Sequence, residues 1–270
     1  MSIFTLFRKS DSPRKTRVAI IGTVGIPACY GGFETLAEHL ASNLAATHDM
    51  TVYCSGKKYL KGNRPASHKG AKLVYIPLEA NGKSSIIYDI ISILHAIWRN
   101  DVLIVLGVSG GLIFPFVRFF TNRKLIVSID GIEWKRDKWG KYARWYLWFA
   151  EYLAVKFSHA DIADNEAIQD YTAIRYKSLS HIIEYGADHA SEQLPEDTDL
   201  IKYPFLKSAY YFSVCRIEPE NNVHILLSAF SRMTDKKYVF VGNWKHSQYG
   251  ITLKEKYSVY ENILMLDPSL

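Results

Sequence analysis

The sequence predicts an α/β fold in which a mostly parallel sheet of Rossmann type carries helices on both faces and is followed by the start of a second, similar unit. Short β-branched runs alternate with longer stretches of helical periodicity from Arg17 onward. A glycine-rich segment follows the first of these runs. The alternation stops near Asp188 and restarts at Tyr210, and a chain of 270 residues with 48% hydrophobic content is long enough for two units.

The predicted strands of the first unit are short segments rich in Val and Ile. They cover residues 17–22, 50–55, 72–77, 102–106, 124–129, 161–163 and 181–185. Helices are expected between them, because apolar side chains recur three and four residues apart in 33–44 and 86–97. Strands joined by helices pair in parallel, so a ligand is expected at the carboxyl ends of the strands.

Four segments are expected along the chain. They are a basic N-terminal extension over 1–16, an N-terminal Rossmann-like domain over 17–187, a polar linker over 188–207, and an incomplete C-terminal Rossmann-like domain over 208–270. The last segment restarts with strands over 210–214 and 238–241 and a helix over 223–233. It has about 60 residues, fewer than the roughly 100 of a typical domain.

Composition excludes several classes of protein. The net charge of +6 is mild; it suits an anionic substrate or an anionic membrane surface, and no concentrated patch indicates nucleic-acid binding. Three widely spaced cysteines without a CxxC pair predict neither a disulfide framework nor a zinc site, and they favour a reducing, cytoplasmic compartment. The first residues lack the order of a secretory signal. The longest apolar stretch, 102–117, is too short and too glycine-rich to span a bilayer.

The glycine-rich segment over 22–34 is the most informative part of the sequence. Gly31 and Gly32 precede a predicted helix, where free N–H groups and the helix dipole favour a phosphate. The alternative is that these glycines only make a tight strand-to-helix turn. The segment matches neither G-x-G-x-x-G nor a Walker A loop, so NAD and ATP are not predicted. An NADP-linked oxidoreductase, with Lys57 and Lys58 on the phosphate, is supported only by the general fold.

Three motifs occur in a characteristic order. The first is Gly22-Thr23-x-Gly25-Ile26-Pro27-Ala28-x-Tyr30-Gly31-Gly32-Phe33-Glu34-Thr35, the second is Asp130-Gly131-Ile132-Glu133-Trp134-Lys135-Arg136-x-Lys138-Trp139, and the third is Arg216-Ile217-Glu218-Pro219-Glu220-Asn221-Asn222. Together they resemble the bacterial rhamnosyltransferases within retaining GT-B glycosyltransferase family 4. The resemblance covers about residues 17–270.

This resemblance implies a GT-B fold and a retaining hexosyltransferase. The expected donor is a nucleotide-sugar, dTDP-rhamnose, bound between two Rossmann-like domains without a metal or another cofactor. The acceptor is expected on the N-terminal domain, as a saccharide or a polyprenyl-linked molecule. Similar enzymes build O-antigens, capsules and other surface polysaccharides, so the expected place is cytoplasmic and peripheral on the cytoplasmic face of the membrane.

The resemblance also implies roles for individual residues. Arg216 takes the place of the diphosphate-binding arginine, whose planar fork suits phosphate oxygens, while Asn221 stands where many relatives have a lysine and Cys215 where glycine is usual. Gly31 and Gly32 complete the donor phosphate site. In a transferase without a metal, arginine and amide hydrogen-bond donors of the protein must stabilise the negative charge that develops on the leaving nucleoside diphosphate. A surface arginine at a strand end is the alternative for Arg216.

The second motif is expected to hold the catalytic carboxylates. Asp130 and Glu133 can hydrogen-bond sugar hydroxyls or act as a base on the acceptor hydroxyl, or they can simply form an Asp-Gly turn and cap a helix. The residues expected on the acceptor side are Glu34, Trp134, Lys135 and Arg136. Glu34 can alternatively be a favourable acid in the first turn of its helix.

Tryptophans concentrate in one stretch of the chain. Trp134, Trp139, Trp145 and Trp148 share residues 134–148 with Lys135, Arg136, Lys138, Lys141 and Arg144. This mixture suits a membrane interface, but the helical spacing of Trp145 and Trp148 equally suits a core. Asp197-Thr198-Asp199 has the form of a metal-binding D-x-D motif, but its place in the polar linker predicts solvated acids.

A rival interpretation follows from the short second unit. In the family, two glutamates separated by seven residues hold the donor's ribose and sugar, and they come after the point reached by residue 270. The alternative function is therefore a truncated, catalytically inactive remnant that acts at most as a binding module. On this ground we expect the chain by itself to transfer no sugar.

Overall fold

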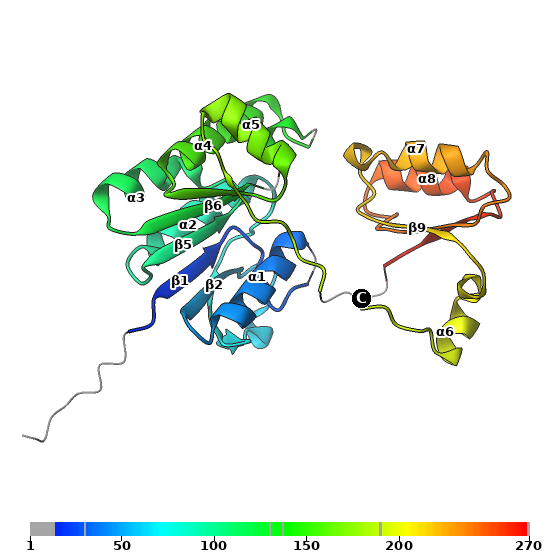
Figure 1. Cartoon of the computed structure of the whole chain (residues 1–270), viewed down its shortest axis with the longest axis horizontal. Helices are drawn as coiled ribbons and strands as arrows, with labels where there is room; N and C mark the ends of the chain where they lie inside the picture. The colour runs from blue at the N-terminus through cyan, green and yellow to red at the C-terminus, as the bar shows by residue number, and fades with distance from the viewer. Residues whose placement is uncertain (1–13, 30, 130, 137, 189–190, 269–270) are drawn as a thin grey trace, which may run out of the picture. The chain divides into compact units, whose positions relative to one another are not determined.

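The computed structural model describes residues 14–29, 31–129, 131–136, 138–188 and 191–268 (Figure 1). The chain divides into two compact units, Met1–Gly186 and Ala187–Leu270. Each unit is an α/β structure with its own sheet and its own core.

The first unit contains an eight-stranded sheet with the order β3-β4-β2-β1-β5-β6-β7-β8. Its strands are β1 (Arg17–Ile21), β2 (Asp49–Ser55), β3 (Ser67–His68), β4 (Ala71–Ile76), β5 (Val102–Leu106), β6 (Lys124–Ile129), β7 (Ala160–Ala163) and β8 (His181–Ile182). Every neighbouring pair is parallel except β3 with β4. The predicted parallel sheet is confirmed. The sequence missed β3, because two residues are too few to display an alternating pattern.

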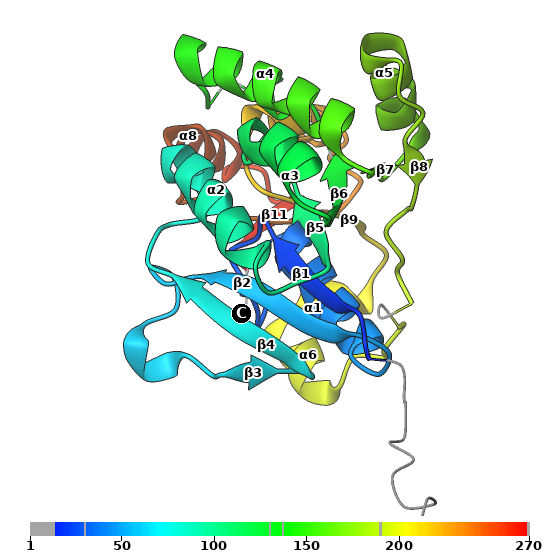
Figure 2. The ribbon, with the colours of Figure 1, turned by 90° about the vertical axis from the view of Figure 1, so that its left-hand side faces the viewer.

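Helices cover both faces of this sheet. They are α1 (Gly32–Leu44), α2 (Ser85–Ala96), α3 (Phe114–Phe120), α4 (Lys141–Phe157) and α5 (Glu166–Tyr176). On one face, Ala37 and Ala41 of α1 pack with Ile20 and Val52 of the strands. Helices α2 to α5 pack on the opposite face, where Figure 2 shows α2, α3 and α4 as neighbours. Within the described ranges, no helix combines the length and the apolarity needed to cross a bilayer.

The strand order places a topological switch point between β1 and β5. From β1 the chain passes through α1 to β2 on one side, and later returns to β5 on the other side. Ligands of such sheets bind at the carboxyl ends of the strands at this point. Gly22 follows β1 with φ +87°, and a Cβ on it would lie 2.1 Å from the Leu106 carbonyl oxygen at the end of β5. Only glycine fits there.

The second unit contains three parallel strands in the order β11-β10-β9. Its elements are α6 (Asp197–Lys202), β9 (Tyr211–Val214), α7 (Val223–Phe230), β10 (Tyr238–Val241), α8 (Gln248–Tyr257) and β11 (Ile263–Leu266). Its core is built around the fully buried Trp244 and Phe240. Helix α6 lies in the stretch expected to be a polar linker. Glu196 and Asp199 form a capping box at its start, which stabilises the helix there.

Candidate functional site

The glycine-rich loop after β1 is anchored by two glutamates one turn apart on α1. The Glu34 Oε1 accepts hydrogen bonds from the Val24 N–H at 2.7 Å and from the Thr23 hydroxyl at 2.9 Å. The Glu38 Oε2 accepts one from the Ala28 N–H at 2.5 Å. Sequence reasoning left Glu34 as an acceptor-side residue or a first-turn acid, and the structure places its buried carboxylate against the loop.

Two tyrosines hold the same loop from other directions. The Tyr88 hydroxyl of α2 donates to the Thr23 carbonyl oxygen at 3.1 Å. The Tyr59 hydroxyl, from the segment after β2, donates to the Pro27 carbonyl oxygen at 2.8 Å. Burial raises the pKa of both phenols, so they remain neutral donors. The loop is therefore held in one shape before any ligand arrives.

Glu38 also joins the loop to the edge of the sheet. Its Oε1 lies 2.7 Å from the Lys69 Nζ and 3.2 Å from the His68 Nε2, at the β3–β4 turn. Burial alone raises the pKa of Glu38, but hydrogen bonds from Lys69, Ala28 and His68 outweigh it and lower the pKa to about 2. The side chain is consequently ionised at neutral pH and holds Ala28 through a charge-assisted bond.

Gly31 and Gly32 have different roles in the structure. Gly31 has φ +130°, and a Cβ on it would lie 2.0 Å from the Glu34 Oε2, so this glycine is needed for the shape of the loop. A Cβ on Gly32 would meet nothing within 4 Å. The N-cap residue of α1 is Gly31, which has no side chain to cap the first turn. The N–H groups at this helix start therefore face a side from which an anion can approach.

The loop that follows β5 lies on the other side of the switch point. The Tyr146 hydroxyl donates a hydrogen bond to the Ser109 carbonyl oxygen of this loop at 2.8 Å. Asp89 of α2 is buried beside this loop, and its Cβ lies 3.1 Å from the place that a Cβ on Gly110 would take. Burial raises the pKa of Asp89 well above its ordinary value. The sequence reasoning did not single out Asp89. The available signal was its place as the only acid in a mostly apolar helix.

The second motif follows β6. Asp130 lies outside the described residues. Glu133 is half-buried, accepts from the Trp139 Nε1–H at 2.9 Å, and pairs with the Lys138 Nζ at 2.7 Å and an Arg136 guanidinium nitrogen at 3.2 Å. Burial by itself raises its pKa, but Lys138, Trp139 and Arg136 outweigh burial and lower it. Glu133 is thus a charged hydrogen-bond acceptor and a weak base.

Trp134 belongs to a cluster of aromatic rings around Arg175. Its Nε1–H donates to the Tyr171 hydroxyl at 3.2 Å, and the Arg175 guanidinium carbon lies 5.1 Å from the centre of its ring. The same guanidinium lies within 5.8 Å of the rings of Trp148, Tyr171 and Tyr176. Cation–π attraction of this kind fixes the Trp134 ring between α4 and α5. Lys135 is exposed beside it.

In the second unit, Arg216 follows β9 and is exposed. Its carbonyl oxygen accepts from the Asn221 Nδ2 at 2.7 Å, so the residue at the usual lysine position closes the local turn. The Asn243 Oδ1 accepts from the Ile217 N–H at 2.8 Å and ties this turn to the end of β10. Arg216 therefore lies just beyond the carboxyl end of β9, at that edge of the three-stranded sheet.

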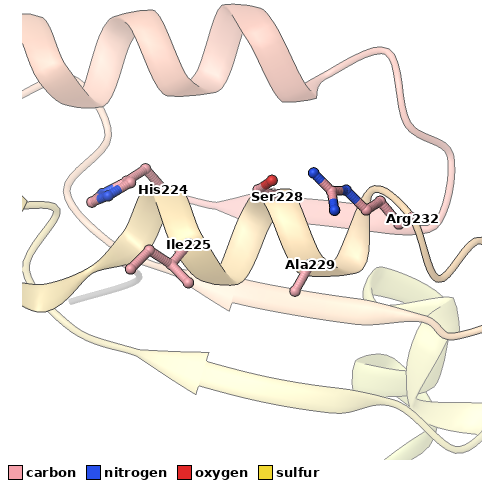
Figure 3. A pocket seen from close by; sticks show the side chains of 5 residues that line it. All are labelled: His224, Ile225, Ser228, Ala229 and Arg232. Carbon is pink, nitrogen blue, oxygen red and sulfur yellow. The ribbon is translucent and has the colours of Figure 1, made fainter.

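A shallow depression runs along α7 (Figure 3). Its lining residues are His224, Ile225, Ser228, Ala229 and Arg232. All five belong to or directly follow one helix, so groups from different elements do not converge there as they do in a small-molecule site.

Among the described residues, no cluster of three or more His, Cys, Asp or Glu side chains could hold a metal ion. In the nominal D-x-D motif, Asp199 accepts from the Glu196 N–H at 3.1 Å.

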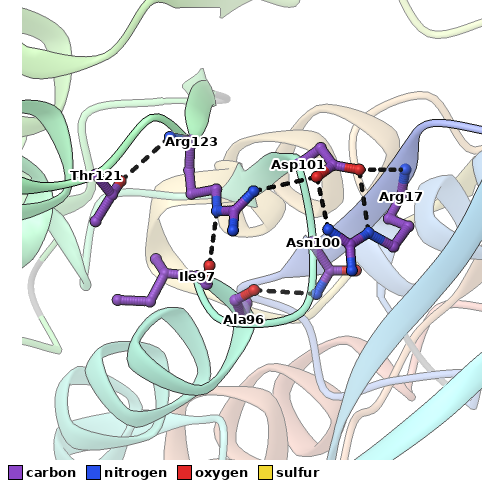
Figure 4. A network of polar contacts seen from close by, with 7 residues as sticks. All are labelled: Arg17, Ala96, Ile97, Asn100, Asp101, Thr121 and Arg123. Carbon is purple, nitrogen blue, oxygen red and sulfur yellow. Dashed lines mark hydrogen bonds and ion pairs between the residues drawn. The ribbon is translucent and has the colours of Figure 1, made fainter.

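The opposite, amino edge of the first sheet carries a charged network around Asp101 (Figure 4). Asp101 Oδ2 accepts from the main-chain N–H and the Nε of Arg17, both at 3.1 Å, and its Oδ1 pairs with an Arg17 guanidinium nitrogen at 2.8 Å and an Arg123 guanidinium nitrogen at 3.1 Å. The bonds from Arg17 lower the pKa of Asp101 to about 2. This network fastens the starts of β1, β5 and β6 and lies away from the ligand edge.

The sequence profile of one family, described as "Domain of unknown function (DUF1972)", matches residues 15–188, which contain the whole eight-stranded sheet. The chain belongs to this DUF1972 family. The family match covers the glycine-rich loop and the second motif, and it ends before Arg216. No curated protein matches the sequence.

Solved structures resemble this DUF1972 chain over both of its units. Sucrose-phosphate synthase from Thermosynechococcus elongatus matches with a TM-score of 0.73 at 13% identity, covering 94% of this chain and 71% of the synthase. HepE of Anabaena in complex with UDP matches at 0.61 and 14% identity, covering 93% and 69%. Arabidopsis thaliana UGT89C1 complexed with UDP-L-rhamnose matches at 0.51 and 12% identity, covering 94% and 70%. The likeness confirms the expected GT-B type fold.

Proposed function

We propose a glycosyltransferase function for this DUF1972 chain, in which a sugar moves from a nucleotide-sugar to a saccharide or lipid-linked acceptor. The alternative remains a binding module that transfers no sugar by itself. The observation that carries the proposal is the start of α1, where the side of Gly32 is open and the loop before it is anchored by Glu34, Glu38, Tyr59 and Tyr88. This arrangement lies at the switch point of the sheet, where ligands of such folds bind. Its first-turn N–H groups suit the diphosphate of a nucleotide-sugar.

The chemistry requires donors that stabilise the leaving nucleoside diphosphate as negative charge develops on it. We propose the N–H groups at Gly32 as such hydrogen-bond donors in the first unit. By the resemblance of the third motif, the guanidinium of Arg216 is proposed as a phosphate-binding group of the second unit. The side chains that anchor the loop, Glu34, Glu38, Tyr59 and Tyr88, are part of the proposed mechanism. They hold the N–H donors in place, so the donors need no reorganisation when charge develops on the leaving group. The positive end of the α1 dipole adds to the same stabilisation.

We further propose that Glu133 accepts hydrogen bonds from a sugar or acceptor hydroxyl. Its lowered pKa keeps it charged, which favours that role over proton removal. Asp130 is proposed as the second carboxylate on the strength of the motif alone. Lys135 and Arg136 are proposed to contact the acceptor, and Glu34 acts indirectly as the anchor of the phosphate loop.

The finer proposal is that the donor sugar is rhamnose, carried by dTDP, for surface polysaccharide synthesis. It rests on the three sequence motifs that resemble bacterial rhamnosyltransferases. A binding panel separates this proposal from its alternatives: dTDP-rhamnose, UDP-glucose, UDP-N-acetylglucosamine and NADPH are each titrated into the 270-residue chain by calorimetry. We expect a nucleotide-sugar to bind and NADPH not to bind.

The same panel includes a matched pair of variants. Gly32→Val is expected to weaken nucleotide-sugar binding at least tenfold, because its side chain enters the open space beside the first-turn N–H groups. Gly62→Val is the control, since Gly62 is also exposed and a Cβ on it also meets nothing within 4 Å. Equal affinity of both variants and the wild type would remove the phosphate-loop proposal. Sugar transfer would release the nucleoside diphosphate. If the chain binds a nucleotide-sugar but releases no nucleoside diphosphate when saccharide or lipid-linked acceptors are added, a binding module is favoured over a transferase.

A further inference from the structure

We propose that the outward face of α2, α3 and α4 docks on an anionic lipid bilayer. This face covers the side of the first sheet opposite to α1, and it differs from the ligand edge described above. The proposal does not depend on the transferase function, because it rests on the exposure and charge of these three helices alone.

Each of the three helices exposes an apolar stripe. The exposed apolar side chains are Ile87, Ile91 and Leu94 of α2 with Trp98 just beyond it, Phe116, Phe119 and Phe120 of α3, and Tyr142, Trp145, Trp148 and Tyr152 of α4. Trp98 is 77% exposed, Phe119 70%, Phe120 75% and Trp145 66%. Large aromatic side chains at this exposure are unusual for a surface that meets only water, and a contiguous patch of them marks an interaction site.

These stripes belong to one surface. The inner sides of the helices, through Tyr88 and Ile93 of α2, Phe114 of α3 and Ala154 of α4, pack in the same core cluster on the same face of the sheet. The outward sides therefore lie on the same side of the sheet, where Figure 2 shows the three helices as neighbours. Phe119 of α3 contacts Phe157, the last residue of α4, with ring centres 5.6 Å apart, so the exposed stripe of α3 lies against the end of α4.

The charges on this face have one sign. The only acids in the three helices are Asp89 and Glu151, and both are buried, at 4% and 0% exposure. The exposed charged side chains of the three helices are Arg118, Lys141 and Lys156. A surface of aromatic rings and cations without exposed acids complements an anionic bilayer, where rings enter the headgroup region and cations meet lipid phosphates.

The same charge pattern argues against a second copy of the chain as the occupant. Two such faces would bring like charges together without a carboxylate to pair with them, which is unfavourable.

The tryptophans that the sequence suggested for membrane contact do not all lie on this face. Trp139 is buried and donates to Glu133, and Trp134 is held in the Arg175 cluster, whereas Trp145 lies on the docking face.

The test is sedimentation of the 270-residue chain with vesicles of pure phosphatidylcholine and of phosphatidylcholine mixed with phosphatidylglycerol. We expect binding to the anionic vesicles at low salt, little binding to the neutral ones, and weakening at high salt, because the cationic contribution is screened. The double variant Phe119→Ser/Phe120→Ser is expected to lower partitioning into anionic vesicles at least tenfold. Arg118→Gln/Lys156→Gln is expected to remove most of the preference for anionic lipid.

The matched control is Leu60→Ser/Val259→Ser, which removes two apolar side chains of 75% and 76% exposure outside the docking face. It is expected to bind vesicles as the wild type does. Thermal unfolding checks that each variant is folded; Leu112→Ser, at 47% exposure beside α3, replaces the phenylalanine pair if that variant unfolds. Failure of the wild type to bind anionic vesicles overturns the proposal. So does an equal loss in the control, or a dimer in light scattering that the phenylalanine variant dissociates.

Discussion

The carboxylate of Glu34 and the main-chain N–H of Val24 are joined by a hydrogen bond of 2.7 Å, ten residues apart in the chain and buried at the switch point of the sheet. Through this bond, helix α1 fixes the shape of the loop that leads into it. The Thr23 hydroxyl shares the same oxygen. Glu34 therefore ties the loop to the helix that follows it, while the space beside Gly32 stays free of other protein atoms within 4 Å of a Cβ at that position.

Removing this anchor is expected to destabilise the protein and loosen the loop. Glu34→Ala leaves the buried Val24 N–H without its partner, and we expect a loss of about 1–3 kcal/mol in the free energy of unfolding. Glu34→Gln keeps an acceptor oxygen and is expected to lose less. Urea unfolding of both variants measures the difference. Wild-type stability in Glu34→Ala would contradict the role of this bond.

The two glycines at the start of α1 are expected to separate folding from binding. Gly31→Ala forces an alanine into φ +130° and against the Glu34 carboxylate, so we expect a loss of roughly 1–3 kcal/mol of stability. Gly32→Val has open space and is expected to change stability by about 1 kcal/mol or less. Unfolding and nucleotide-sugar titration are measured on both variants. If Gly32→Val unfolds as readily as Gly31→Ala, the two glycines do not divide their roles in this way.

Arg216→Ala is expected to weaken binding of a nucleoside diphosphate by about 1.5–3 kcal/mol, which is roughly tenfold or more. Arg216→Lys keeps the charge but not the planar fork, so we expect only partial recovery. Arg232→Ala removes another exposed arginine of the second unit and serves as the control. Calorimetric titration with dTDP and UDP measures all three. Equal losses in Arg216→Ala and Arg232→Ala would show a general effect of charge and count against a specific site.

Asp101 is expected to contribute to loss of stability in acid. Its pKa in the folded chain, about 2, lies below the ordinary value of about 3.9, so the folded state binds the proton less readily than the unfolded state. The stabilisation is therefore present above pH about 4 and is lost as the pH falls toward 2. The side chain is 35% exposed, so solvent screening keeps the effect near 1 kcal/mol. Urea unfolding between pH 7 and 2 tests this: Asp101→Asn should flatten the acid limb, and an unchanged limb would exclude the contribution.

The sequence by itself determined the kind and order of most elements. Hydrophobic periodicity depends on neighbours within a few residues, so the seven parallel strands of the first unit and helices such as α1 and α2 were predictable to within a few residues. Strands joined by helices also predicted a ligand edge at the carboxyl ends. The glycine-rich loop was predictable as a strand-to-helix turn, because glycine adopts positive φ and permits close approach of neighbouring groups, as Gly22 and Gly31 do.

Only the tertiary structure decided what the individual side chains do. Tyr88 reaches Thr23 across 65 residues of sequence, and Glu34 turns to the loop as its anchor. Trp139 is buried against Glu133, whereas Phe119 and Phe120, which resemble core residues in the sequence, are exposed on α3. These outcomes depend on which faces of distant elements meet. A local pattern records that a side chain is apolar or charged, but it does not record which partner the folded chain brings to it.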